Sequence, residues 1–413
     1  MMHPVSLIFY NLGILIYVSV LRLISPFHPK ANKWITGRKN TFNKIKEWKN
    51  NTHPSFTILI HCASLGEYEQ SIPLLSQLKT HYPNGHLVIT FFSPSGYDQI
   101  KINSCISQVF YLPADFRRDV KRFVKCINPK MVILIHKELW YHFINELYLN
   151  KIPIYIVNGV FNQSDISYYP WNTHALKRIR WFFLVDSHST YPLVNKGFNN
   201  IKITGDLRIE RMKRLSKEQW NHPLMEFKQK GDRCFIYGSV YSQDIHIIQP
   251  FIQDHPNDIH LIFPHELDQR NIAGIKKKLI LPCEIYSEHS DIQTNIYIID
   301  IIGVLKYAYR MADVVYIGGG FNQGIHSVVE ALVYSKPVIF GPNYHKYPLV
   351  KELLKYGYAC SIRDSDSFAY YMNIKWAEKD KLRTKIEKFV DSKSASSEEI
   401  VQKIQNLNES SLQ

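Results

Sequence analysis

The sequence predicts an α/β protein with two Rossmann-like, doubly wound domains that face a central cleft, preceded by an apolar, membrane-associated helix. Three observations lead to this prediction. Short β-branched stretches alternate with helical stretches in two sets, which a charged segment separates. A run of three glycines directly follows one strand pattern of the second set. An almost entirely apolar stretch lies close to the N-terminus.

The N-terminal prediction depends on residues 5–21, VSLIFYNLGILIYVSVL, which are nearly all apolar. A full membrane span takes about 20 residues, so this helix either crosses once or lies in the interface. The basic residues that follow it are Arg22, Lys30, Lys33, Arg38, Lys39, Lys44, Lys46 and Lys49. Such residues stay on the cytoplasmic side and attract anionic headgroups. We expect a membrane-associated helix over residues 1–28; the alternative is a buried helix that caps the first domain.

The first domain is expected over residues 29–210. Its predicted strands are residues 56–61, 86–91, 108–111, 131–135, 153–157, 182–185 and 201–204. Helical patterns between them include residues 115–126 and 138–149. This alternation is typical of a parallel sheet with helices on both faces.

The second domain is expected over residues 211–390, after a link around residues 210–230 that is charged and has no β-character. Its predicted strands are residues 234–238, 259–263, 284–286, 296–299, 314–317 and 337–340. Residues 365–405 are largely helical in pattern, and residues 391–413 are expected to form a C-terminal helix and polar tail. Ligands of such domains bind at the carboxyl ends of the strands, in the cleft between them.

The glycine-rich segment, residues 313–342, has the pattern strand, glycine turn, helix, strand, with its helix predicted over residues 324–333. A helix N-terminus behind a glycine turn offers unpaired N–H groups and suits a phosphate. Glu330, two turns into that helix, could accept hydrogen bonds from ribose hydroxyls. The spacing GGGxxxG and the lack of an acidic residue at the dinucleotide distance argue against a nicotinamide or flavin cofactor. The alternative is that the glycines only solve packing.

Composition restricts the partners of the protein. With 21% charged and 45% hydrophobic residues the chain is globular, and its net charge of +14 favours an anionic partner such as nucleic acid, acidic lipid or a phosphorylated substrate. The six cysteines are scattered without a CxxC pair, which argues for a reducing compartment and against a zinc site. No metal-ligand histidine spacing is present, so we expect no catalytic metal.

Glu67 is the strongest candidate for a catalytic acid or base, because it follows a glycine at the end of the first strand. Burial could move its pKa toward neutrality and let it take a proton from a hydroxyl. Alternatively it is the capping-box partner of Ser64. Glu138, past the fourth strand, could assist transition-state charge or cap the next helix.

Two basic residues follow later strands. Arg208, at the end of a predicted strand, could pair with a phosphate or a carboxylate, or form a bridge to Asp206 or Glu210. His265 could donate a hydrogen bond to a phosphate, or be held by hydrogen bonds of the fold alone.

Several sequence blocks, in order and over nearly the full chain, resemble those of the 3-deoxy-D-manno-octulosonic acid (Kdo) transferases, GT-B glycosyltransferases of Gram-negative lipopolysaccharide synthesis. The blocks are HCASLGEYEQSIPLL, KELWYHFI, VNGVF, TGDLRIER, FPHELDQR and the glycine-rich segment, which resembles GGSxxxxGGHNPLEAAxxxxPVxxGP. The resemblance implies transfer of Kdo from CMP-Kdo to a lipid A precursor, lipid IVA, with inversion and without a metal or other cofactor. It implies a location on the cytoplasmic face of the bacterial inner membrane, among anionic lipids and without nucleic acid.

The resemblance also implies site residues. It makes Glu67 the general base and gives Arg208, where the family usually has lysine, the role of stabilising charge. His136 replaces the first acid of the family's ExELW block, so the role of that acid is left to Glu138 or lost. The implied substrate- and donor-binding residues are Ser64, Gly66, Gly238, Ser239, Pro264, His265, Gly303, Val304, Leu305, Gly319, Gly320, Asn322, Gly324, His326, Ser327, Val328, Val329 and Glu330.

Departures from the family pattern keep other functions open. GSVYSQD stands where the family has STHEGEE, HSVVE replaces HNPLE, and the arginine of PRHPER is missing. These changes fit lineage variation, altered donor choice or lost activity. The alternatives are therefore another GT-B transferase that uses a different nucleotide sugar on a lipid or cell-wall precursor, or a catalytically silent, membrane-bound nucleotide-sugar binder. Nucleic-acid binding is disfavoured because the basic cluster lies beside the apolar stretch rather than among aromatic residues.

Overall fold

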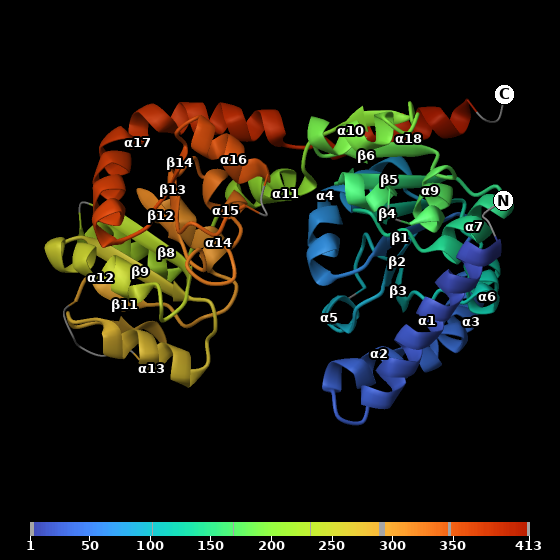
Figure 1. Ribbon diagram of the computed structural model, residues 1–413, viewed down its shortest axis with the longest axis horizontal. Helices are drawn as coiled ribbons and strands as arrows, with labels where there is room; N and C mark the ends of the chain where they lie inside the picture. The colour runs from blue at the N-terminus through green and yellow to red at the C-terminus, as the bar shows by residue number, and fades with distance from the viewer. Residues whose placement is uncertain are drawn as a thin grey trace. The chain divides into compact units, whose positions relative to one another are not determined.

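The computed structural model describes residues 4–100, 102–167, 169–231, 233–288, 294–345 and 348–410. The chain divides into two compact units (Figure 1). The first unit is Met1–Arg211 together with Lys393–Gln413, and the second is Met212–Ser392. Within the described residues, each unit holds one seven-stranded sheet whose strand pairs are parallel. The predicted α/β class with two doubly wound domains is confirmed.

The first sheet has the order β3-β2-β1-β4-β5-β6-β7. Its strands are β1 Thr57–Cys62, β2 His86–Phe91, β3 Gln108–Tyr111, β4 Met131–Ile135, β5 Ile154–Gly159, β6 Trp181–Leu184 and β7 Ile201–Ile203. The chain runs outward in one direction from β1 and in the other from β4, so the topological switch point lies between these two strands. The loops that follow β1 and β4 therefore meet at the ligand-binding edge of the sheet.

Both faces of this sheet are covered, which explains the continuous apolar character of its strands. Leu59 and Val132 belong to the core beneath the helices α3 Thr41–Thr52, α6 Arg117–Ile127 and α7 Tyr141–Leu149. Ile60 and Ile133 belong to the opposite core, beneath α4 Leu65–His81 and α18 Ser397–Glu409. The other helices of this unit are α2 Pro29–Lys39, α5 Pro94–Tyr97, α8 Gln163–Ser167, α9 Pro170–Leu176, α10 Ser187–Val194 and α11 Leu207–Ser216.

The N-terminal helix α1, Pro4–Ile24, is long and apolar enough to cross a membrane, with a mean hydropathy of 2.0. One of its faces is attached to the first unit. The Tyr10 hydroxyl donates to Asp115 Oδ2 at 2.5 Å and accepts from the Tyr141 amide at 3.1 Å. Asn11 Oδ1 lies 2.6 Å from His142 Nε2. Large apolar side chains elsewhere on the helix, such as Ile8, Phe9 and Leu23, are exposed.

Helix α7 begins later than predicted, because its cap comes from a distant residue. Asp115 accepts hydrogen bonds from the His142 and Phe143 amides at 2.8 and 2.9 Å. These are first-turn amides of α7, so the helix begins at Tyr141 and residues 136–140 form a loop instead of the predicted first turn. Asp115 itself stands before α6 rather than within it, which is why the helix predicted over residues 115–126 begins at Arg117.

The second sheet has the order β10-β11-β9-β8-β12-β13-β14. Its strands are β8 Cys234–Val240, β9 Ile259–Pro264, β10 Glu284–Ile285, β11 Ile296–Ile298, β12 Val314–Ile317, β13 Val338–Phe340 and β14 Ala359–Ser361. The helices of this unit are α12 Ile245–Asp254, α13 Gln269–Lys278, α14 Leu305–Ala308, α15 Val329–Leu332, α16 Pro348–Lys355 and α17 Ser365–Lys393, with short helices η1 Pro223–Lys230, η2 Tyr286–Glu288 and η3 Tyr309–Met311. The edge strand β14 was not predicted, and the switch point lies between β8 and β12.

Two predicted helices are wrong in extent. The helix predicted over residues 324–333 is a single turn, α15, because Gly324 has a φ of 127° and the Ile325 amide donates to the Asn343 carbonyl at 3.1 Å. The helix predicted over residues 365–405 breaks into α17 and α18. At the break, the Asp206 amide donates to the Lys393 carbonyl at 2.8 Å and the Ala395 amide to the Asp206 carbonyl at 3.2 Å. The chain then returns to the first unit as α18, which packs against α4.

Candidate active site

The loop after β1 holds the candidate base. Ser64 caps α4, and its Oγ accepts a hydrogen bond from the Glu67 amide at 3.4 Å. The Glu67 carboxylate turns back and accepts from the Ala63 amide at 2.5 Å. This capping-type arrangement is the structural alternative that the sequence offered, and it is formed. It also fixes the carboxylate of Glu67 at the switch point of the first sheet. Gly66 lies exposed beside it in the first turn of the helix.

Burial and, second, the nearby Glu138 carboxylate raise the pKa of Glu67 to about 7, against the opposing effect of the Ala63 and Ser64 amides. Burial also raises the pKa of Glu138, although Trp140 and Lys137 lower it. A carboxyl group with a pKa near neutrality is suited to accept a proton at physiological pH. Glu138 does not cap α7, since Asp115 serves that role.

His136 directly follows β4 and has a φ of 69°, in the left-handed region that few residues other than glycine and asparagine adopt. Burial lowers its pKa, and the neighbouring Lys137 and Arg208 charges lower it further, against the influence of Asp206. The imidazole is therefore neutral at physiological pH. It cannot supply the negative charge of the acid that the family pattern has at this position.

Arg208 lies in the first turn of α11 and not at the end of a strand, as the sequence had suggested. Its Nη2 lies 2.7 Å from Asp206 Oδ2, and its Nε donates to Oδ1 and Oδ2 of the same carboxylate at 3.2 and 3.0 Å. The Asp206 side chain is buried, whereas that of Arg208 is 47% exposed. The bridge to Asp206, which was one alternative, is formed, and it leaves part of the guanidinium accessible.

Asn158 was not predicted to have a role, yet it joins three elements around Glu67. It is buried and has a φ of 58°. Its Nδ2 donates to Gln70 Oε1 of α4 at 2.9 Å, and its Oδ1 accepts from the Leu207 amide of α11 at 2.9 Å. The Asn-Gly pair at the end of a strand could have indicated this special backbone position, because asparagine tolerates the left-handed conformation.

The carboxyl edge of the second sheet is formed by close backbone contacts. A Cβ on Gly318 would overlap the Ser239 carbonyl, one on Gly320 would overlap the Gly341 backbone, and one on Gly238 would overlap the Tyr309 hydroxyl. Gly319 instead needs its φ of 86°. Close packing therefore explains why several of these positions are glycine. The predicted helix N-terminus directly behind the glycine turn is not formed, because α15 is only four residues long and begins at Val329.

Asp244, which was not predicted, organises this edge. Its Oδ2 accepts from the Tyr241 and Gly319 amides at 2.9 and 3.3 Å, and its Oδ1 accepts from the Tyr316 hydroxyl at 2.8 Å. Burial raises its pKa. The Gly319 amide, a predicted phosphate ligand, is therefore already engaged. The only signal in the sequence was the acid retained in the segment GSVYSQD.

His265 and His326 come together in a stack beside the glycine turn. Their ring centroids are 4.2 Å apart, and the Tyr241 ring lies 4.8 Å from that of His265. His326 Nε2 lies 3.2 Å from the Tyr241 hydroxyl. Burial and the charge of His265 lower the pKa of His326 to about 4, so this ring is neutral at physiological pH.

The other predicted donor-binding residues vary in their accessibility. Val328 and Val329 are buried, so only their backbone could meet a ligand, whereas Ser327 is exposed. Glu330 lies in the first turn of α15, not two turns into a helix. Pro264 ends β9, and Gly303 has a φ of 86° just before Val304 and Leu305, at the start of α14. Gly324 follows the glycine turn. Asn322 donates a hydrogen bond to Gln243 Oε1 at 3.2 Å. Among the described residues, no group of three or more His, Cys, Asp and Glu side chains suits a metal ion.

Comparison with known proteins gives consistent results. The family model described as 3-deoxy-D-manno-octulosonic-acid transferase (kdotransferase) matches residues 36–211. The chain is 25% identical over 316 residues to the 3-deoxy-D-manno-octulosonic acid transferase of Haemophilus influenzae, covering 73% of this chain and 74% of that protein. It is 26% identical over 344 residues to the enzyme of the same name from Chlamydia trachomatis serovar A, covering 78% of each chain.

Among solved structures, the UDP-GlcNAc 2-epimerase of Neisseria meningitidis superposes with a TM-score of 0.62 at 14% identity, over 85% of this chain and all of that one. This likeness concerns the fold, in which two doubly wound units follow one another. The alignments with these two relatives cover about three quarters of this chain and therefore extend over both units. The family model covers most of the first unit. The chain is therefore similar to Kdo transferases over most of its length, and the Kdo transferase family model matches most of its first unit.

Proposed function

We propose that the protein transfers Kdo from CMP-Kdo to a lipid A precursor, lipid IVA, with inversion and without a metal ion. Similarity to Kdo transferases, in the family model and in curated relatives, supports glycosyl transfer. The observation that carries the mechanism is the Glu67 carboxyl group, held at the switch point of the first sheet with a pKa of about 7. Deprotonated Glu67 accepts the proton of the acceptor hydroxyl as that oxygen attacks the sugar and CMP leaves.

Charge on the departing CMP needs a cationic partner. Arg208 is the candidate in the first unit, because its side chain is 47% exposed while its bond to Asp206 fixes its direction. The guanidinium carries five N–H groups, and the exposed part of this side chain can meet a phosphate. We assign donor contacts in the second unit to the region of His265, Gly303–Leu305 and the segment from Ser327 to Glu330.

The acceptor is a phosphorylated lipid, and the N-terminal helix suits a membrane location. Tyr10 and Asn11 hold one side of α1 against the first unit. Ile8, Phe9 and Leu23 on its other side are 64%, 63% and 74% exposed. A helix attached along one face and apolar on the other is typical of the interface between headgroups and acyl chains. We therefore place the protein on the cytoplasmic face of the inner membrane, with α1 in that interface.

The test is incubation of the purified protein with CMP-Kdo and tetra-acylated lipid A precursor, followed by mass measurement of the product. We expect a gain of one or more Kdo units, also in the presence of EDTA. Parallel incubations contain UDP- and GDP-sugars in place of CMP-Kdo. Product from one of these alone would overturn the proposed donor, and a strict need for a divalent ion would overturn the metal-independent mechanism.

A further inference from the structure

A cavity lies in the second unit, at the edge of the sheet opposite to the predicted donor residues. Its volume is about 690 Å³. Asp313 and Lys336, which line it, stand just before the starts of β12 and β13, and Lys228 belongs to η1 before β8. The donor residues follow the carboxyl ends of these strands. The cavity is therefore separate from the predicted donor residues of the second unit.

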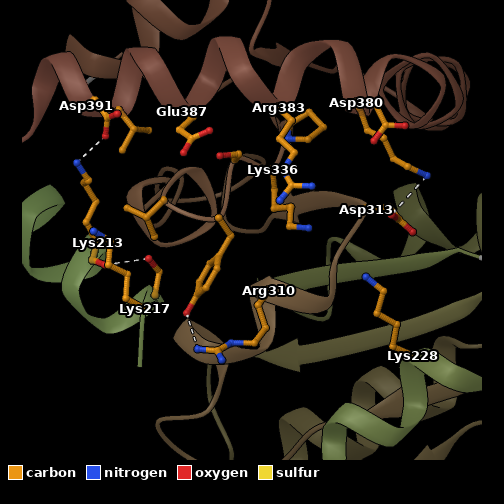
Figure 2. A pocket seen from close by; sticks show the side chains of 17 residues that line it. Lys213, Lys217, Lys228, Arg310, Asp313, Lys336, Asp380, Arg383, Glu387 and Asp391 are labelled. Carbon is orange, nitrogen blue, oxygen red and sulfur yellow. Dashed lines mark hydrogen bonds and ion pairs between the residues drawn. The ribbon is translucent and has the colours of Figure 1, made fainter. Parts of the chain in front are cut away.

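The walls of this cavity are predominantly cationic. Figure 2 shows Asp380, Arg383, Glu387 and Asp391 along α17, with Lys336 and Arg310 on the facing segments. Its seven basic residues are Lys213, Lys217, Lys228, Arg310, Lys336, Lys379 and Arg383, against the four acids Asp313, Asp380, Glu387 and Asp391. Two of the acids form ion pairs with lysines of the same cavity: Lys213 lies 2.5 Å from Asp391, and Lys379 lies 3.5 Å from Asp313.

Four of these cations make no ion pair or hydrogen bond with their side chains within the part of the chain that the structure describes. They are Lys217, Lys228, Lys336 and Arg383. Lys336 is largely buried, and burial together with the charge of Lys228 lowers its pKa to about 8. Burying an unpaired cation is unfavourable, and a bound anion would remove that cost.

The cavity also has ordered and apolar elements. Both terminal nitrogens of Arg310 donate to the Glu218 carbonyl at 3.2 Å, and Nη2 also reaches the Tyr334 hydroxyl at 3.5 Å. Val333, Pro337 and Tyr334 supply apolar surface beside the charges. The volume is typical of sites for small organic molecules. The free carboxylates Asp380 and Glu387 suit hydroxyl groups on such a molecule.

We propose that this cavity is a second binding site, for a phosphate-bearing polyanion that also carries hydroxyl groups. Clustered lysines with an arginine are the usual partners of phosphate oxygens, since each contributes charge-assisted hydrogen bonds. The same chemistry is present in a soluble sugar phosphate or nucleotide and in the headgroup of an acidic phospholipid. The experiment below distinguishes the two sources.

The first arm titrates the full-length protein with pyrophosphate by calorimetry. We expect saturable binding to the wild type, weakened about tenfold or more by Lys336→Gln/Arg383→Gln, because two charge-assisted contacts are lost. Lys217→Gln/Arg383→Gln is a second variant that leaves the buried Lys336 in place. The matched control is Lys381→Gln/Lys385→Gln, which removes the same charge from exposed positions of α17 that do not line the cavity.

The second arm measures sedimentation with phosphatidylcholine vesicles that contain or lack phosphatidylglycerol. A loss of pyrophosphate binding with unchanged vesicle binding in the cavity variants identifies a soluble ligand. A loss of binding to the anionic vesicles, with or without a loss of pyrophosphate binding, identifies a lipid headgroup. The proposal is overturned when both cavity variants match the Lys381→Gln/Lys385→Gln control with both probes.

Discussion

Glu67 combines a structural and a chemical role in one carboxyl group. Its hydrogen bond to the Ala63 amide fixes the loop after β1, and burial next to Glu138 moves its pKa from the usual 4.5 to about 7. The base form is the deprotonated one, so its population rises as the pH rises through 7. The acidic limb of the rate profile should therefore lie near pH 7, well above the usual range of a glutamate.

Substitution Glu67→Gln removes the base while retaining a side chain of the same shape. We expect kcat for Kdo transfer to fall by a factor of about 10² to 10⁴, the usual contribution of a general base. Binding of CMP, measured by calorimetry, should stay close to that of the wild type. Full activity of the variant, or a wild-type profile that is flat between pH 5 and 8, would remove Glu67 from this role.

Glu138 should act on the reaction through Glu67. Its charge is the second cause of the raised pKa of Glu67, after burial. Glu138→Gln removes that charge, so the pKa of Glu67 should fall and the acidic limb of the pH–rate profile should move to lower pH. The control is Glu69→Gln, because Glu69 is exposed on α4. If Glu138→Gln lowers the rate at every pH without moving the limb, Glu138 has a different function.

The residues that the sequence missed share a physical cause. Ser64 and Glu67 are three positions apart, so a local capping pattern predicted their contact. Asn158 joins Gln70 to the Leu207 amide, and Asp244 joins the Tyr316 hydroxyl to the Gly319 amide. These partners are distant in the sequence, and only the tertiary fold brings them together. Local spacing contains no information about such contacts.

At the scale of the elements, the strands were predicted best, because buried parallel strands are continuous β-branched stretches. The helix over residues 324–333 failed although its apolar positions are buried, as Ile325 and Val328 show. Their spacing matches a helix, but they lie in a loop held by the Asn343 carbonyl. Hydrophobic periodicity reports burial and cannot by itself separate a short helix from an ordered loop. The three-residue edge strand β14 is too short to have a pattern.

The Tyr10 hydroxyl makes two of the hydrogen bonds that attach α1 to the first unit. Substitution Tyr10→Phe removes its bonds to Asp115 and to the Tyr141 amide and leaves both groups buried. We expect the free energy of unfolding in urea to fall by about 1–3 kcal/mol, the usual cost of unsatisfied buried polar groups. Amide hydrogen exchange in α1 should become faster.

A Tyr191→Phe variant is the control for the Tyr10 substitution. The Tyr191 side chain is 67% exposed, so loss of its hydroxyl should leave stability within about 0.5 kcal/mol. Equal unfolding free energies for the two variants would show that the Tyr10 bonds do not hold α1 in place.

At the scale of the whole molecule, the sequence predicted the division into two α/β units but not the path of the tail. Residues 391–413 were expected to form a C-terminal helix and polar tail, with no partner predicted for the helix. In the structure α18 packs against α4, and Ser397 hydrogen-bonds Glu210 through its amide and hydroxyl at 2.9 and 2.6 Å. The helical periodicity predicted a helix here but not the surface that it packs against, because an apolar helix face does not specify which part of the protein covers it.

The membrane location depends on apolar surface that faces away from the first unit. Phe9→Ser/Ile16→Ser removes two large side chains of α1 that are 63% and 55% exposed, without touching Tyr10 or Asn11. Burial of such side chains contributes about 1.5–3 kcal/mol each, so binding to vesicles should weaken by more than tenfold while the unfolding free energy stays unchanged. Ile302→Ser, at a position that is 88% exposed in the second unit, is the control.

Activity measured in two acceptor presentations completes this prediction. A protein held at the surface meets a lipid acceptor at high effective concentration, so its release should lower turnover of acceptor embedded in vesicles. The same variant should transfer Kdo normally to acceptor dispersed in detergent, because the candidate active site is intact. Equal losses in both presentations would place Phe9 and Ile16 in substrate binding, and unchanged vesicle binding would show that α1 is not the membrane contact.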